Sequence, residues 1–109
     1  MMVLFDNGTP RTLARYLIDQ HTVTEARSQG WAELENGELL GNAEAAGFEV
    51  LVTTDRNISY QQNLAGRKIA IVVLGKGRWA LIEPRVAQVV AAVNGARPGS
   101  YMEVDIPFE

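Results

Sequence analysis

The chain has 109 residues, of which 47% are hydrophobic, and a formal net charge of −3 at pH 7. This length and apolar content suit a single globular domain over residues 1–109 and leave little room for a second. The negative net charge argues against a protein that coats nucleic acid by bulk electrostatics. Any contact with nucleic acid should therefore be local.

The chain contains no cysteine, and it opens without the basic stretch, apolar run and cleavage site of a secretory signal. Its apolar stretches are far shorter than the roughly 20 residues that span a bilayer. We therefore expect a cytoplasmic protein that does not enter a membrane.

The first part of the chain predicts a strand, a helix and a second strand. Residues 3–5 are apolar and end in a turn cluster, after which Thr9 and Pro10 look like an N-cap and a first helical residue. Apolar residues at three- and four-residue spacing extend that helix to about Gln20. β-branched residues then favour a weaker strand over 21–26.

The middle of the chain predicts a second helix and a fully buried strand. Asn36 looks like the N-cap of a helix that Gly47 closes. Residues 50–54 form a near-continuous apolar and β-branched run, which is typical of a strand covered on both faces. Residues 57–64 are polar and predict a short helix or a structured loop.

The last part of the chain predicts the clearest strand, over residues 69–74, followed by a turn at 75–78. Pro84 is expected to open a last helix that Gly95 ends, and the alternation over 101–105 indicates an edge strand. Strands that alternate with helices predict an α/β fold. We expect a three-layer α/β/α sandwich around a mainly parallel sheet of about five strands.

Two of the predicted strands end in an aspartate: Asp6 follows the first strand and Asp55 follows the strand at 50–54. Ligands of such sheets collect at the carboxyl ends of strands, so these two carboxylates are expected close together, and like charges in contact require a cation. Hard oxygen ligands favour Mg²⁺ or Mn²⁺. Glu38, in the first turn of the second helix, is a candidate third carboxylate.

Each of these acids also has a purely structural interpretation. Asp6 and Asp55 would then be turn or capping residues, and Glu38 a charge favoured by the helix dipole. Other glutamates are predicted to be solvated surface charges: Glu33, Glu35 and Glu44.

Basic and aromatic residues add weaker signals. Arg11 and Arg56 lie in or near predicted loops and are candidates for holding phosphate, although scattered surface arginines are common. Trp31 and Trp79 are predicted to be packing anchors rather than platforms for bases. His21 has no Ser or Cys partner in view, which argues against a nucleophilic triad.

Five short motifs stand in order along the chain, at residues 4–6, 9–11, 30–31, 36–40 and 52–57. In this order they resemble the small bacterial branch of the PIN-like superfamily. The segment 60–66, which precedes an apolar strand, resembles one subgroup of that branch. The resemblance covers most of residues 3–95.

The resemblance implies a Mg²⁺- or Mn²⁺-dependent nuclease, often a ribonuclease toxin that pairs with an antitoxin protein. It puts Asp6, Glu38 and Asp55 at the acid positions of the catalytic and metal site. Asn57 stands where many relatives carry a further aspartate, so its side chain would contact a metal-bound water or a phosphate. Asn7 also replaces a common acid, and weak or lost activity is therefore expected.

Two alternatives remain open. A binding or regulatory module would keep the PIN-like fold and act through a protein partner such as an antitoxin. A receiver-like or flavodoxin-like domain would also cluster acids at strand ends, but Lys76 is a poor match for the lysine that this class requires. Small PIN-like proteins commonly pair, so a homodimer is expected, with an apolar patch near Tyr101 or Trp79.

Overall fold

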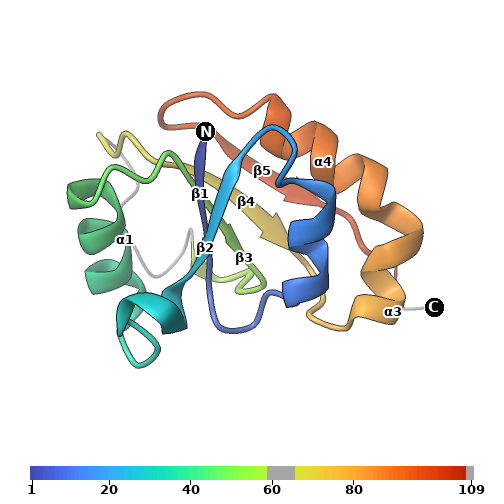
Figure 1. The fold of residues 1–109 in the computed structure, drawn as a ribbon, viewed down its shortest axis with the longest axis horizontal. Helices are drawn as coiled ribbons and strands as arrows, with labels where there is room; N and C mark the ends of the chain where they lie inside the picture. The colour runs from blue at the N-terminus through green and yellow to red at the C-terminus, as the bar shows by residue number, and fades with distance from the viewer. Residues whose placement is uncertain (59–65, 108–109) are drawn as a thin grey trace.

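The computed structural model of the chain describes residues 1–58 and 66–107 (Figure 1). At its centre is a parallel five-stranded sheet in the order β2-β1-β3-β4-β5. The strands are β1 (Met2–Phe5), β2 (Thr22–Glu25), β3 (Val50–Thr53), β4 (Ala70–Leu74) and β5 (Tyr101–Val104). The predicted α/β class and the parallel sheet of about five strands are confirmed.

In the described part of the chain, helices follow β1, β2 and β4. The α-helices of these described residues are α1 (Asn36–Ala45), α3 (Trp79–Ile82) and α4 (Val86–Asn94), and their 3₁₀ helices are η1 (Arg11–Tyr16), η2 (Ala26–Gln29) and η3 (Glu83–Arg85). None of the helices in the described ranges is long and apolar enough to cross a membrane.

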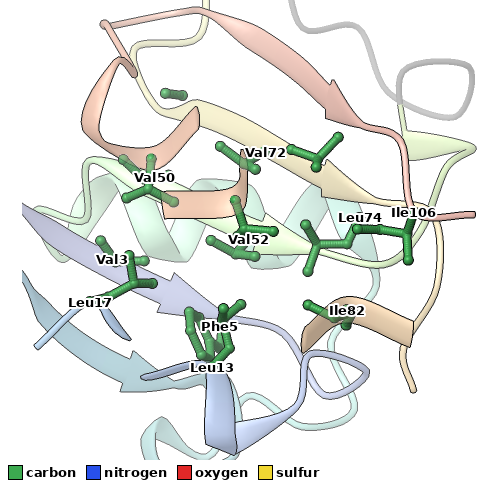
Figure 2. Close-up of a cluster of buried hydrophobic side chains, with 14 residues drawn as sticks. Val3, Phe5, Leu13, Leu17, Val50, Val52, Val72, Leu74, Ile82 and Ile106 are labelled. Carbon is green, nitrogen blue, oxygen red and sulfur yellow. The ribbon is translucent and has the colours of Figure 1, made fainter. Parts of the chain in front are cut away.

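Both faces of the central strands are buried, since every residue of β3 and β4 is buried and successive strand residues point to opposite faces. On one face Phe5 and Val52 belong to the same buried cluster as Val89 of α4. Figure 2 shows Phe5 and Val52 within this cluster. On the other face Leu51 packs with Leu40 of α1. Figure 1 shows α1 on one side of the sheet and α4 on the other, which is consistent with the predicted three-layer sandwich.

The first predicted helix is shorter than its periodicity indicated. It was expected to begin at Pro10 and run to about residue 20, but the regular segment is only the 3₁₀ helix η1. Pro10 occupies the cap position, and no side chain caps the helix. Thr9 is not the predicted N-cap, because its hydroxyl donates to Asp6 instead.

Other boundaries differ as well. The last helix was expected to open at Pro84, but α3 already begins at Trp79 and Pro84 lies inside η3. The helix η2 was not predicted. Gly47 follows α1 with a φ of 89°, as expected of a residue that ends a helix in the left-handed region. Residues 59–64 of the predicted loop lie outside the described residues.

The strand order sets the switch point of the sheet between β1 and β3, where Phe5 pairs with Val52. From β1 the chain goes to one edge at β2, and it then crosses back to β3 and continues through β4 to β5. The loops at the carboxyl ends of β1 and β3 therefore diverge. Doubly wound sheets of this strand order bind their ligands at that place.

Candidate functional site

Asp6 and Asp55 lie at the carboxyl ends of β1 and β3, the two strands at the switch point. The amide of Asp6 donates to the Val52 carbonyl at 3.1 Å, which continues the pairing beyond β1. The buried Thr53 side chain joins the two acids: its hydroxyl donates to Asp6 Oδ2 and accepts the Asp55 amide at 3.1 Å. The prediction that the strands ending at these aspartates are parallel neighbours is confirmed.

The Asp6 carboxylate is held by the loop that follows it. Its Oδ1 accepts hydrogen bonds from the Gly8 amide at 3.1 Å and the Thr9 hydroxyl at 2.7 Å. The Thr9 hydroxyl also lies 2.9 Å from the Val52 carbonyl, so two acceptors share its single proton. The contact with Gly8 is an Asx-turn, the structural role that the sequence offered as an alternative for Asp6.

Asp55 makes the same kind of turn and a second, longer-range contact. Its Oδ1 accepts the Asn57 amide at 2.9 Å, and its Oδ2 accepts the side-chain amide of Asn36 at 2.8 Å. Asn36 was predicted to be the N-cap of α1, but Glu35 occupies that position and Asn36 is the first helical residue. The Asn36 side chain instead fastens the start of α1 to the end of β3.

The loops at this edge pack closely against one another. A Cβ atom on Gly8 would lie well under 3.0 Å from Thr54 Oγ1. A Cβ atom on Gly77 would lie 2.9 Å from the Gly8 carbonyl oxygen. The predicted turn at 75–78, which joins β4 to α3, therefore lies against the loop that follows Asp6.

Glu38 lies in the first turn of α1, as predicted, and its side chain is exposed. Among residues 1–58 and 66–107, no group of three His, Cys, Asp or Glu side chains is placed to hold a metal ion. The role of Glu38 as a ligand stays a prediction. Asp6 and Asp55 still offer hard oxygen atoms at one edge, and Mg²⁺ commonly binds through one or two carboxylates completed by water and phosphate. This pair fits a divalent cation of that kind.

The predicted phosphate-binding residues lie around the same edge but face different parts of it. Arg11, whose side chain is 80% exposed, pairs with Glu25 at the end of β2, with 2.7 Å between Nε and Oε2. The Arg56 guanidinium lies against Gly75, since a Cβ atom on that glycine would be 3.6 Å from Cζ. Arg56 also lines a pocket of about 280 Å³ beside the ends of β4 and β5. Phosphate binding by these residues and by the exposed Asn57 stays a prediction.

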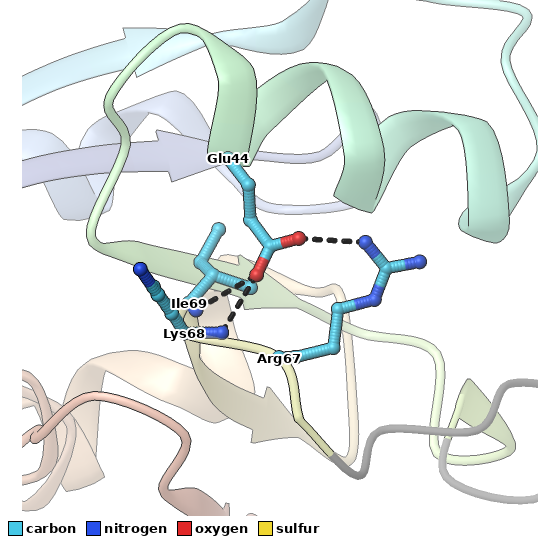
Figure 3. Close-up of polar contacts among 4 residues, drawn as sticks. All are labelled: Glu44, Arg67, Lys68 and Ile69. Atoms are coloured by element: carbon cyan, nitrogen blue, oxygen red, sulfur yellow. Dashed lines mark hydrogen bonds and ion pairs between the residues drawn. The ribbon is translucent and has the colours of Figure 1, made fainter.

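Glu44 was predicted to be a solvated surface charge, and that prediction is wrong (Figure 3). Its Oε1 forms an ion pair of 2.6 Å with Arg67, and its Oε2 accepts the amides of Lys68 and Ile69 at 2.7 and 3.2 Å. Partial burial alone would raise the pKa of Glu44. The hydrogen bonds and the Arg67 charge outweigh burial and hold this pKa below its ordinary value of 4.5.

A pocket of about 550 Å³ adjoins Glu44 and Phe48 at the amino edge of the sheet, opposite Asp6. It is larger than the pocket beside Arg56, but it lies where the strands begin. Ligands of doubly wound sheets bind at the other edge, so position outweighs size in the choice of the candidate site.

The aromatic predictions can be compared with two ring contacts. Trp31 packs edge-on against Phe48, with centroids 6.1 Å apart, which confirms its packing role. Trp79 meets Tyr16 at 5.7 Å and also contacts the core beneath it. His21 Nε2 lies 2.6 Å from the side-chain oxygen of Asn94, a contact that fits a structural role.

Three side chains of this edge were missed or misread in the sequence: Thr9, Asn36 and Thr53. Thr53 carried a usable signal, because a hydroxyl in a strand predicted to be covered on both faces needs a hydrogen-bond partner. The structure shows this side chain to be 1% exposed. Asn36 carried none, since a helix-start asparagine reads as a cap whether or not a distant carboxylate lies opposite.

Comparison of the chain with models of protein families, with curated proteins and with solved structures finds no match. Function therefore has to be inferred from the residues at the carboxyl edge.

Proposed function

We propose that the chain is a Mg²⁺- or Mn²⁺-dependent nuclease that hydrolyses phosphodiester bonds in RNA. One observation carries the proposal: Asp6 and Asp55 stand at the ends of the two switch-point strands and are joined through the buried Thr53 hydroxyl. The resemblance to the PIN-like superfamily supports nuclease chemistry at this place. A bound divalent ion would polarise the phosphodiester and lower the pKa of an attacking water.

The chain's own residues would bind the divalent ion and orient its ligands. Asp6 and Asp55 would each contribute carboxylate oxygens, and their turn hydrogen bonds hold the two carboxylates in fixed directions. Thr53 donates a hydrogen bond to the Asp6 carboxylate and Asn36 donates one to the Asp55 carboxylate, so both would act as positioning residues.

Residues around the edge would complete the site. Glu38 would add a third carboxylate, directly or through water. Arg56 or Arg11 would steady the scissile phosphate through charge-assisted hydrogen bonds. Asn57 would contact a metal-bound water or a phosphate oxygen, where many relatives of the resembled family carry an acid.

The proposal extends to cellular context. We expect a cytoplasmic protein, in keeping with the absence of cysteine, that forms a homodimer and is held inactive by an antitoxin protein. Sedimentation of the purified chain as a monomer at micromolar concentration would remove the dimer from this picture.

The test combines Mn²⁺ titration with an RNA cleavage assay. Asp55→Asn should abolish cleavage, because it removes one of two carboxylate charges, and excess chelator should abolish cleavage by the unchanged protein. Asp105→Asn is the matched control, since Asp105 is an exposed acid that follows β5 at the same edge. Full cleavage by Asp55→Asn, or in chelator, would remove the nuclease assignment.

A second candidate is a binding module, and one observation favours it. All four carboxylate oxygens of Asp6 and Asp55 accept hydrogen bonds from this chain. The acids would then shape loops that contact a protein partner. If calorimetry detects no binding of Mn²⁺ and the correctly folded protein cleaves no RNA, the binding module is selected.

A further inference from the structure

Two aromatic rings meet where η1 and α3 lie side by side (Figure 1). The Tyr16 and Trp79 centroids are 5.7 Å apart and the ring planes are inclined by 33°. Tyr16 is 44% exposed, whereas Trp79 is partly buried and packs against the core. Trp79 thus fixes the pair to the core, and the Tyr16 ring is the one accessible to solvent.

The ring pair adjoins the carboxyl edge. Trp79 begins α3 directly after the turn at 75–78, and Gly77 of this turn lies against the Gly8 carbonyl, two residues after Asp6. The helix η1 also starts from this edge, because it follows the loop that leaves β1. The loop after Asp6 thus leads directly into η1 and lies against the turn that precedes α3.

The charges around the rings suit a phosphate backbone. An exposed arginine directly precedes each ring, Arg15 in η1 and Arg78 before α3. The acids of the same connections, Asp19 and Glu83, come later along segments that return toward the amino edge. Each ring thus has an exposed cation as its neighbour in sequence, although the whole chain carries a net charge of −3. Local cations of this kind attract phosphates without bulk electrostatics.

We propose that Tyr16 and Trp79 form a stacking surface for the bases of single-stranded RNA whose phosphates follow Arg78 toward Asp6. The inference rests on the proposed function for the identity of its ligand. Every base has a π-face, so stacking should contribute affinity with little sequence preference. The surface would hold substrate beside the acids and would not take part in the chemistry.

Trp79 itself is the reporter for the test. The chain has two tryptophans, so Trp31→Phe leaves Trp79 alone, and Trp31 lies apart, packed on Phe48. An oligoadenylate of about 12 nucleotides, titrated in excess chelator, should quench Trp79 emission. Tyr16→Ala should raise the Kd roughly tenfold, and Tyr16→Phe should keep it, because stacking needs the ring and not the hydroxyl.

Two controls separate stacking from charge. An abasic strand of equal length keeps the phosphates and should bind roughly tenfold more weakly than oligoadenylate. Arg78→Ala should weaken binding and reduce its salt dependence, whereas Arg97→Ala should not, since Arg97 is an exposed arginine at the amino edge.

Several outcomes would overturn the stacking surface: no binding of oligoadenylate, equal binding of the abasic strand, or an unchanged Kd in a folded Tyr16→Ala variant. A homodimer that Tyr16→Ala dissociates would also overturn it, because the rings would then be buried between copies. Binding is measured without divalent ions, so it can fail independently of cleavage. If the protein cleaves RNA but Tyr16→Ala leaves the Kd unchanged, only the stacking surface is refuted. If binding depends on the rings but the protein cleaves no RNA, only the nuclease proposal is refuted.

Discussion

Replacing Glu44 with glutamine should destabilise the fold through one defined cluster (Figure 3). Glutamine can still accept the Lys68 and Ile69 amides through its oxygen, but its own amide then faces the Arg67 guanidinium, donor against donor. The two paired side chains are 25% and 26% exposed, so solvent screens them only in part. A lost hydrogen bond to a charged group costs about 1.5–3 kcal/mol, and partial exposure favours the lower end.

The loss should depend on pH in a definite direction. The folded protein lowers the pKa of Glu44, so the carboxylate stabilises the folded state fully above the unfolded value near 4.5. This contribution disappears as the pH falls through the lowered folded pKa. The difference in unfolding free energy between the unchanged protein and Glu44→Gln should therefore be full at neutral pH and shrink in acid.

Urea unfolding followed by tryptophan fluorescence, at neutral pH and at about pH 3.5, measures this difference. A loss of about 1.5 kcal/mol should appear as a fall in Tm of about 5–10 °C. Glu33→Gln makes the same charge change at an exposed position and should have little effect. Equal stability of Glu44→Gln and the unchanged protein at neutral pH, or an equal loss in Glu33→Gln, would refute the reasoning.

Two further predictions concern the carboxyl edge. Thr53→Val removes the hydroxyl between Asp6 and Asp55, and urea unfolding should show a loss of about 1–3 kcal/mol that Thr53→Ser avoids. Gly8→Ala should cost about 1–3 kcal/mol in thermal or urea unfolding, because the new methyl meets Thr54 Oγ1. Thr54→Ala in the same chain should recover most of that loss, and purely additive effects in this double-mutant cycle would contradict the contact.

The sequence by itself was enough to predict the central strands of the sheet. Residues of β3 and β4 are apolar apart from Thr53, and a near-continuous apolar run is typical of a strand buried on both faces, so the central place of these strands follows from local composition. It was not enough for the first helix. Leu13 and Leu17 are buried, as their spacing predicted, but a short 3₁₀ helix followed by a turn buries the same two side chains as a longer α-helix.

The candidate site was also predicted only in part from the sequence. That Asp6 and Asp55 end strands could be predicted, because the end of an apolar run is a local property of the chain. The partners of their oxygens were decided by tertiary structure: Asn36 reaches Asp55 from 19 positions away, and Thr53 reaches Asp6 from 47. The same holds for Glu44 and Arg67, 23 positions apart. Such contacts depend on strand order and helix placement, which bring distant residues together only once the whole sheet has formed.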